Sequence, residues 1–384
     1  MNKKILIVAS VWGFVAKFAS EDVRILKELG YEVHFASNKS NPIFQFPENI
    51  YEDMEVIYHD IDIWQSPFGV SHNVRAIEQI RNIIREEQID VVHCHTPSGG
   101  LVARLAAWGT SAYVIYTAHG FHFYKGAGRV HNFIYYTIEK FLSRITDFIV
   151  TINQEDYHAA QKMHEREGSC QIPGMGLDRT YFHATTAKQR EEARKELYVE
   201  DKFMLLGVGE LRENKNPAVI IKALACLKNE GTDIGFICYG LLGAGKQREE
   251  LQNLAEQLGV AEQVIFYGYQ MDVRPYLMAA DVMVFPTIRE GLGMAALEAL
   301  AMGVPVLAAD NRGTREYMQD MVNGYVCKEN TPEAYASYIS RMYEEKERWG
   351  ESVERRVIIR RSTEHFDRKE TAIIMKKVYE RVKN

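Results

Sequence analysis

The chain has 384 residues, of which 46% are apolar and 26% charged, and its formal net charge is -6 at neutral pH. This length exceeds one ordinary domain and suits two domains of roughly 150–200 residues each. The slight acidity argues against a global basic field that would attract nucleic acid. We therefore expect a globular protein of two domains with no nucleic-acid partner.

The cysteines and the N-terminal segment indicate the cellular compartment of the protein. The five cysteines are dispersed with no C-x-x-C pair, which is typical of a reducing environment. The apolar run at 5–10 leads into Trp12 and Gly13 instead of a cleavage site, so it reads as a first buried strand and not as a signal peptide. No run of about 18 apolar residues occurs. These features predict a cytoplasmic protein.

Strand-like and helix-like segments alternate through the first half. Continuous apolar strands separated by amphipathic helices predict a parallel sheet covered on both faces. The strands are expected at 5–10, 32–36, 90–94, 113–117 and 147–151. The helices are expected near 21–29, 73–87, 101–108 and 132–143.

The alternation breaks at 173–188, which is the best candidate for an interdomain linker, and then restarts. The expected strands of the second half are 204–208, 234–239, 264–267, 282–285 and 304–308. The expected helices are 218–229, 247–258 and 293–303, and Gly313 is expected to open another. The predicted fold class is α/β with two doubly wound domains, in which ligands lie beyond the carboxyl ends of the strands. We assign 1–180 to an N-terminal domain, 181–360 to a C-terminal domain, and 361–384 to a C-terminal helix for which a return to the first domain is one option.

The most informative stretch runs from Phe285 to Val306. A strand ends at Phe285, a loop holds Glu290, and a helix begins near Gly293. Glycines in this loop leave backbone amides bare at the helix N-terminus, where the helix dipole also favours an anion such as a diphosphate.

Two carboxylates, Glu290 and Glu298, flank that anion site. Carboxylates only accept hydrogen bonds, so they suit the hydroxyls of a sugar or a ribose. The alternative is that Glu290 is a solvated loop residue and Glu298 a helix-surface residue. The apolar run 294–302 around Glu298 favours a functional role, because an unpaired charge there would be costly.

Glu290 and Glu298, with Glu-Gly-Leu-Gly after the first and Glu-Ala-Leu-Ala-Met-Gly-Val-Pro-Val after the second, resemble the signature of glycosyltransferase family 4. The resemblance extends over the whole chain. It implies the GT-B fold, with two Rossmann-like domains facing a cleft, of which 1–180 would bind the acceptor and 181–360 the nucleotide-sugar donor. It also implies that Glu290 contacts the transferred sugar beside the reacting centre and that Glu298 binds the donor ribose.

Other segments carry the same resemblance on the donor side. The stretch 208–216 resembles the family element whose lysine grips the donor diphosphate, and Lys215 matches that lysine. Glu210 stands where the family usually has arginine, and Arg212 is the candidate to replace it. The full expected donor-binding set is Gly13, Glu210, Arg212, Lys215, Tyr269, Glu290, Gly291, Leu292, Gly293, Met294 and Glu298.

The segment 116–126 is similar to the acceptor-domain loop of bacterial capsular and exopolysaccharide members. His119 matches the active-site histidine of the family, which lies by the transferred sugar, and forms, with Glu290, the expected catalytic pair. A single histidine after a strand is more often structural, but its place beside Gly120 favours the site. The expected acceptor-side residues are His95, His122 and Lys125.

Two acidic or histidine patterns are discounted as metal sites. The D-x-D spacing at 60–62 lies far in sequence from the donor motifs, and His93-Cys94-His95 lacks further ligands at a suitable spacing. We expect no metal site. The basic and aromatic stretch 121–144 has two interpretations, core packing or contact with an anionic membrane surface.

The sequence thus predicts a retaining, metal-independent hexosyl- or N-acetylhexosaminyltransferase with no cofactor. By family resemblance its donor is a UDP-sugar, and its acceptor is a glycan or an undecaprenyl-diphosphate-linked sugar in polysaccharide synthesis, reached at the inner face of the cell membrane. The alternatives are a nucleotide-sugar epimerase of the same fold and a non-catalytic sugar-nucleotide binding protein. A dinucleotide oxidoreductase is disfavoured, because 10–15 lacks G-x-G-x-x-G after the first strand.

Overall fold

The structure is a computed structural model that describes residues 3–40, 46–64, 69–351 and 353–382. The chain divides into two compact units. Unit 1 comprises Met1–Gly176 with Arg368–Asn384, and unit 2 comprises Leu177–Asp367. The first crossing between the units lies in the predicted linker at 173–188, and the second lies a few residues after 360.

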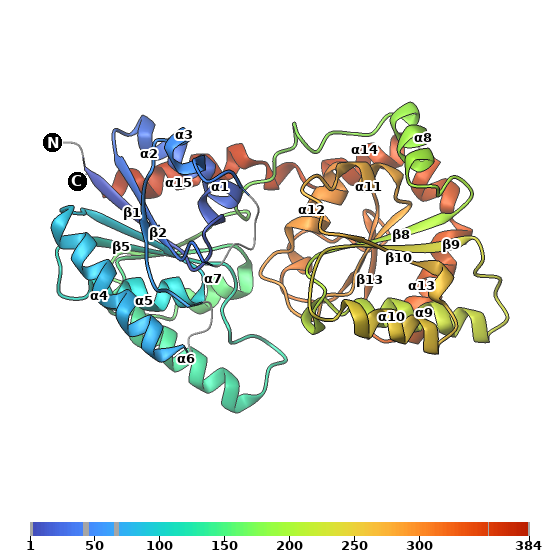
Figure 1. The fold of residues 1–384 in the computed structure, drawn as a ribbon, viewed down its shortest axis with the longest axis horizontal. Coiled ribbons are helices and arrows are strands. Elements are labelled where there is room, and N and C mark those ends of the chain that lie inside the picture. The colour runs from blue at the N-terminus through green and yellow to red at the C-terminus, as the bar shows by residue number, and fades with distance from the viewer. Residues whose placement is uncertain (1–2, 41–45, 65–68, 352, 383–384) are drawn as a thin grey trace. The chain divides into compact units, whose positions relative to one another are not determined.

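Unit 1 contains a parallel sheet in the order β3-β2-β1-β4-β5-β6-β7. Its strands are β1 Lys4–Val8, β2 Glu32–Ser37, β3 Ile57–Asp60, β4 Val91–His95, β5 Tyr113–Ala118, β6 Phe148–Thr151 and β7 Gly168–Gln171. Its helices are α1 Phe14–Phe18, α2 Ser20–Glu28, α3 Ile50–Asp53, α4 Val70–Glu86, α5 Pro97–Ala107, α6 Arg129–Ser143, α7 Gln154–Ala160 and α15 Arg368–Arg381. Figure 1 shows α4 and α5 along one face of this sheet and α2 and α15 along the other, with α15 (red) packed beside α2 (blue).

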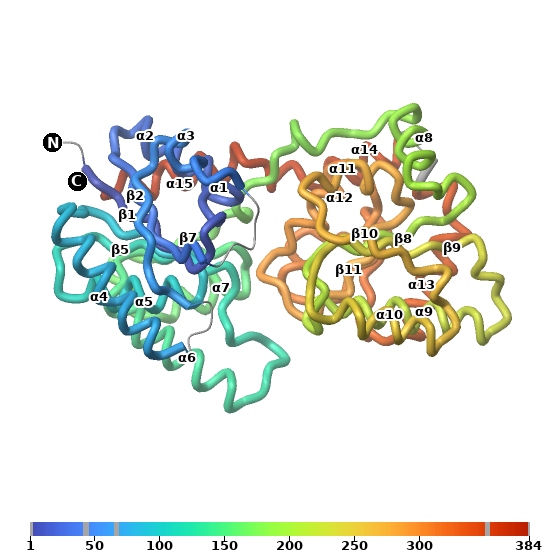
Figure 2. The backbone as a smooth tube through the Cα atoms, in the orientation of Figure 1, coloured from blue at the N-terminus to red at the C-terminus, as the bar shows by residue number. Residues whose placement is uncertain are grey.

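Unit 2 contains a parallel sheet in the order β10-β9-β8-β11-β12-β13. Its strands are β8 Phe203–Val208, β9 Ile237–Leu242, β10 Val264–Gly268, β11 Val282–Phe285, β12 Val306–Ala309 and β13 Gly324–Cys327. Its helices are α8 Ala187–Glu196, α9 Pro217–Asn229, α10 Arg248–Gln257, α11 Arg274–Ala279, α12 Met294–Ala301, α13 Pro332–Glu344 and α14 Val353–Arg361. The tube in Figure 2 follows α9, α10 and α13 on one face and α11, α12 and α14 on the other.

Both sheets are doubly wound around a central buried strand. Ile5 of β1 pairs in parallel with Val33 of β2 on one side and with Val91 of β4 on the other. In unit 2, β8 pairs with β9 and with β11 in the same way. The strand order therefore reverses between β1 and β4 and between β8 and β11, and ligands of such sheets bind outside the carboxyl ends of the strands at these points.

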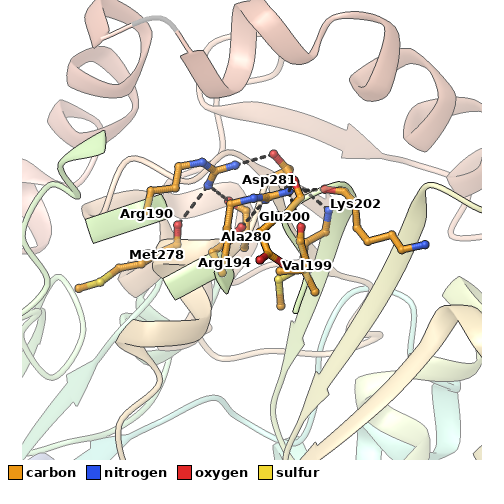
Figure 3. Close-up of polar contacts among 10 residues, drawn as sticks. Arg190, Arg194, Val199, Glu200, Lys202, Met278, Ala280 and Asp281 are labelled. Atoms are coloured by element: carbon orange, nitrogen blue, oxygen red, sulfur yellow. Dashed lines mark hydrogen bonds and ion pairs between the residues drawn. The ribbon is translucent and has the colours of Figure 1, made fainter. Parts of the chain in front are cut away.

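A cluster of charged side chains holds α8 against the opposite, amino-terminal ends of the strands of unit 2. Arg190 and Arg194 of α8 pair with Asp281, which precedes β11, at 2.6 and 3.0 Å. Asp281 also accepts a hydrogen bond from the backbone amide of Met204 on β8 at 2.7 Å. Figure 3 shows both guanidinium groups directed at Asp281 and at neighbouring carbonyls. These ion pairs and hydrogen bonds anchor α8 to the sheet.

Several elements differ from the expectations. The edge strands β3, β7 and β13 were not predicted, nor were the helices α1, α3, α7, α8, α11 and α13. Gly313 opens only a 3-10 turn over Thr314–Glu316, not a helix. The strand expected from 234 begins at Ile237, because Asp233 accepts a hydrogen bond from the amide of Gly235 and forms a turn there.

No helix of the described residues is long and apolar enough to cross a membrane.

Candidate active site

A hollow lies where β8 and β11 end, at the reversal point of unit 2. Strand, loop and helix residues contribute to it because β8, β9 and β11 end side by side. It is lined by Gly207, Val208, Gly209, Glu210, Leu211, Lys215, Pro217, Tyr239, Leu241, Val284, Phe285, Pro286 and Thr287.

The structure brings Lys215 and Glu290 together beside this hollow. The Lys215 ammonium pairs with Oε1 of Glu290, and the two side chains are 23% and 15% exposed. Lys215 also lies over the Phe285 ring, at 5.6 Å from its centroid. A half-buried cation next to a carboxylate can bind an anionic diphosphate while the carboxylate accepts sugar hydroxyls.

Two residues that the sequence analysis missed hold the Glu290 loop in place. Asn214 exchanges hydrogen bonds with it: its carbonyl accepts from the amide of Ile288 at 2.9 Å, and its side-chain amide donates to the carbonyl of Arg289 at 3.0 Å. Arg312, which is 6% exposed, donates from Nε to the carbonyl of Glu290 at 3.2 Å. These partners are distant in sequence, so no local pattern revealed them.

Gly293 begins α12 in a left-handed conformation, with φ at 94°. A Cβ at this position would lie 2.8 Å from the Phe285 ring and 3.0 Å from the Tyr317 hydroxyl. Glycine is therefore required both by the backbone and by the space. This turn lets Met294 start the helix directly after the loop, and the first amides of a helix have no partner within it.

Glu298 lies partly buried on α12, one turn and a half further along. Burial, with contributions from the charges of Asp272 and Glu298, raises the pKa of Tyr181. The Arg274 guanidinium covers that Tyr181 ring at 3.7 Å from its centroid. The charge of Glu298 thus acts on Tyr181, a residue of unit 2.

Glu210 and Arg212 pair with each other. Their side chains are 3.4 Å apart and are 59% and 55% exposed. Glu210 lines the hollow, whereas Arg212 does not occur among its lining residues. Replacement of the family arginine by Arg212 therefore stays a prediction.

The loop after β9 lies directly against the loop after β8. Gly243 has φ at 148°, and a Cβ there would lie 1.8 Å from the carbonyl oxygen of Gly209. The amide of Gly243 donates to the carbonyl of Gly268 at 2.8 Å, so the loop carrying Tyr269 is joined to the same edge. Tyr269 is 42% exposed there.

In unit 1 the carboxyl ends of β4 and β5 bring His95 and His119 together. Nδ1 of His95 lies 3.1 Å from Nε2 of His119. Burial lowers the pKa of His119 to about 4 and that of His95 well below its ordinary value. Both rings are therefore neutral at physiological pH, which suits hydrogen bonding better than transfer of a proton.

Gly13 precedes α1, whose first residue Phe14 packs against this histidine pair. The Phe14 ring lies 4.8 Å from the His95 ring and 5.5 Å from the His119 ring. Trp12 is buried against Tyr51, with ring centroids 5.7 Å apart. The Gly13 loop thus carries aromatic side chains onto the histidine side of unit 1.

His122 and Lys125 lie further along the loop that leads into α6. The His122 ring stacks on Tyr135 of α6 at 5.0 Å, and its carbonyl accepts from Nε2 of His131. The Lys125 amide donates to Glu155, and its side chain contributes to a hollow beside α6. Of the expected acceptor-side residues, His122 and Lys125 therefore lie beside α6, whereas His95 lies apart from them and pairs with His119.

The discounted metal motifs have ordinary protein partners. Asp62 pairs with Arg75 at 3.1 Å, and Asp60 accepts from the Lys39 amide at 2.9 Å. His93 bonds the hydroxyls of Tyr379 and Thr117. Within the described ranges, no group of three or more histidine, cysteine or acidic residues could hold a metal ion.

Comparison with known proteins follows the same division of the chain. Residues 188–360 match the family described as glycosyl transferases group 1, and residues 4–153 match the glycosyl transferase 4-like family. EpsD of Bacillus subtilis, named as a glycosyltransferase, is 38% identical over 90% of this chain and 89% of its own. An Escherichia coli protein named UDP-Gal:alpha-D-GlcNAc-diphosphoundecaprenol alpha-1,3-galactosyltransferase is 20% identical over 86% of this chain and 85% of its own.

Solved structures show the same fold. The Anabaena protein HepE in complex with UDP-glucose has a TM-score of 0.77 at 18% identity and covers 98% of this chain and 99% of its own. The two doubly wound parallel sheets and the similarity to this structure identify the fold as GT-B, a fold of glycosyltransferases. The chain belongs to the glycosyl transferase group 1 and 4-like family and is a glycosyltransferase.

Proposed function

We propose that this glycosyltransferase transfers a hexose or N-acetylhexosamine from a UDP-sugar to a lipid-linked saccharide during polysaccharide assembly, with retention at the anomeric carbon and without a metal. The observation that carries the proposal is the Lys215–Glu290 pair beside the strand-end hollow of unit 2. Relatives support the substrate class, since HepE was solved with UDP-glucose and the Escherichia coli relative is named for a UDP-sugar and a diphosphoundecaprenol acceptor.

The proposed reaction breaks the bond between the anomeric carbon and the diphosphate oxygen, and the bonding electrons leave with UDP. The sugar passes through an oxocarbenium-like state. The acceptor hydroxyl attacks from the face that the diphosphate leaves, and its proton passes to the departing phosphate. Lys215 and the amides at the start of α12 stabilise the growing negative charge. Glu290 orients the sugar hydroxyls, and Glu298 takes the ribose.

A transfer assay tests this function directly. The full chain is incubated with each of a panel of radiolabelled UDP-hexoses and UDP-N-acetylhexosamines and with undecaprenyl-diphosphate-linked saccharides. We expect one donor to be transferred in the presence of EDTA, with the anomeric configuration of the donor preserved in the NMR spectrum of the product. Inversion would overturn the retaining mechanism, and conversion of the nucleotide sugar without acceptor would identify an epimerase instead.

The outer face of α6 supports a lipid-linked acceptor. Glu139 pairs with Arg104 of α5 at 2.9 Å, and Arg104 is fully buried, so this side of α6 faces the protein. The opposite side carries large apolar residues that are 42% to 73% exposed. They are Val130, Phe133, Ile134, Ile138 and Phe141.

Such an apolar stripe on a surface helix is typical of an interaction site. Arg129 and Arg144 are exposed at its two ends, and an amphipathic helix with basic flanks binds the surface of an anionic bilayer. We include in the proposal that this face of α6 contacts the membrane that holds the acceptor.

Vesicle binding tests the membrane contact. The double variant Phe133→Ser/Ile138→Ser is expected to bind phosphatidylglycerol-containing vesicles at least about tenfold more weakly in sedimentation, because apolar burial is lost. The control is Ile373→Ser, which removes an apolar side chain that is 53% exposed on α15. Equal binding of the double variant and the wild type would exclude this face as the contact.

A further inference from the structure

Three histidines lie together at the carboxyl ends of β4 and β5. His93 and His95 are two residues apart on β4, so they share one face of the strand, and both are fully buried. Ring centroids are 4.1 Å apart for His93 and His95 and 5.3 Å apart for His95 and His119. The cluster therefore runs from the buried His93 through His95 to His119, the residue expected by the sugar.

All three rings are neutral at physiological pH. Burial lowers the pKa of His93 to about 3 and that of His119 to about 4, and it also lowers the pKa of His95 well below its ordinary value. A neutral imidazole has one N–H donor and one bare nitrogen acceptor. The arrangement of hydrogen bonds in the cluster therefore depends on which nitrogen of each ring carries the proton.

The contact between His95 and His119 requires one proton between their nitrogens, which are 3.1 Å apart. If His119 donated it from Nε2, His95 would carry its own proton on Nε2. That nitrogen is buried and has no hydrogen-bond partner in the described part of the chain. If His95 donates from Nδ1, the unpartnered nitrogen is a bare acceptor, and an unsatisfied buried acceptor is more common in proteins than an orphaned buried N–H.

The Phe14 ring does not change this assignment. It lies 4.8 Å from the His95 ring with an angle of 40° between the planes. An N–H bonded to a ring face favours an approach closer to perpendicular. The arrangement in which His95 donates is therefore the less costly one, because the group that it leaves without a partner is an acceptor and not an N–H.

We propose that His95 is a positioning residue that holds His119 as the Nδ1–H tautomer. The inference rests on the proposed function, and on the expectation from the family resemblance that His119 lies by the transferred sugar. Nδ1 of His119 makes no hydrogen bond with any described residue, so its N–H is available to a ligand. In this role His119 donates a hydrogen bond to a sugar oxygen and does not act as a proton-transfer group.

His93 supports this arrangement from the interior. Its Nδ1 lies 3.0 Å from the Tyr379 hydroxyl of α15, and its Nε2 lies 2.7 Å from the Thr117 hydroxyl of β5. Both of its nitrogens are therefore occupied by hydroxyl groups. His93 is held rigidly behind His95 and does not compete for the proton shared with His119.

The tautomer of His119 can be measured without any substrate. In long-range proton–nitrogen NMR spectra of the histidine-labelled full chain, we expect the wild-type His119 ring to show the Nδ1–H pattern, assigned by its loss in His119→Gln. His95→Leu should shift the ring toward the Nε2–H form. A wild-type ring in the Nε2–H form, or an unchanged tautomer in His95→Leu, would overturn the proposal. Because no turnover is needed, this result stands apart from success or failure of the transfer assay.

Matched substitutions extend the test to activity. The side-chain amide of Asn reaches the position of Nδ1, whereas that of Gln reaches the position of Nε2. We expect His95→Asn to retain kcat within about threefold, and His95→Gln and His95→Leu to lose about 10- to 100-fold, as for other residues that orient a functional histidine. A merely structural role would give Asn and Gln similar losses that follow their thermal stability, and that result would contradict the inference.

Discussion

Replacing Glu290 with glutamine is expected to lower kcat for sugar transfer by about 100- to 1000-fold, equivalent to about 3–4 kcal/mol of transition-state stabilisation. The substitution keeps the shape of the side chain but removes its charge. Glu290 is only 15% exposed and pairs with Lys215. Its backbone is held by Arg312, so the loop should keep its conformation in the variant. The loss should therefore fall on kcat and not on folding.

Measurements of UDP binding and of a control variant test whether the effect of Glu290→Gln is specific to sugar transfer. UDP affinity, measured by calorimetry, should stay within about threefold, because the carboxylate reads the sugar and not the nucleotide. The control is Glu262→Gln, an exposed residue just before β10 and thus at the opposite ends of the strands. If Glu290→Gln and Glu290→Ala both transferred sugar at the wild-type rate, Glu290 would have no part in the reaction.

Replacing Lys215 with alanine is the second large change, with an expected fall in kcat/KM of about 1000-fold. This ammonium is the cation at the edge of the strand-end hollow, and it is held there by Glu290 and over the Phe285 ring. Without this ammonium, the negative charge on the leaving diphosphate is no longer stabilised, and the site is only partly exposed to water that could take its place. Lys215→Arg should recover part of the rate, because the charge returns with a different geometry. Steady-state kinetics with the donor identified by the transfer assay measures both values.

A double-mutant cycle tests whether Lys215 and Glu290 act together or independently in catalysis. If Lys215 and Glu290 act as a unit, the double variant Lys215→Ala/Glu290→Ala should lose hardly more than the worse single variant. Additive losses would mean that the two residues act independently. Lys222→Ala, an exposed lysine on α9, should leave the rate unchanged and serves as the control.

Local sequence patterns were sufficient for the central strands and for the loop of Glu290. Strands such as β1 and β11 contain continuous apolar runs, because both faces of a parallel sheet are covered. The limits of β11 match its run, whereas β1 ends at Val8, two residues before the predicted end. The edge strands differ, since β7 reads Gly-Ser-Cys-Gln and is only half-buried throughout. Its pairing with β6 comes from backbone hydrogen bonds that its side chains do not encode.

Contacts between distant segments were beyond the reach of sequence reasoning. Tyr379 meets His93 across 286 positions. The return of the C-terminal helix to the first domain was one option from the sequence, but the packing of α15 on α2 was not predicted. The arginine that secures the Glu290 loop lies 22 residues further along the chain. Periodicity reports which residues are buried but not which buried residues meet, because that depends on the packing of whole elements.

The Lys215–Glu290 pair shows where this division falls. The sequence by itself determined that each residue follows a buried strand and that both carry the type of charge a sugar nucleotide needs. Only the tertiary structure decided that they form one ion pair, because β8 and β11 are adjacent in the sheet although 75 residues separate the two side chains. It likewise decided that His95 reaches His119, since neighbouring parallel strands end at the same edge.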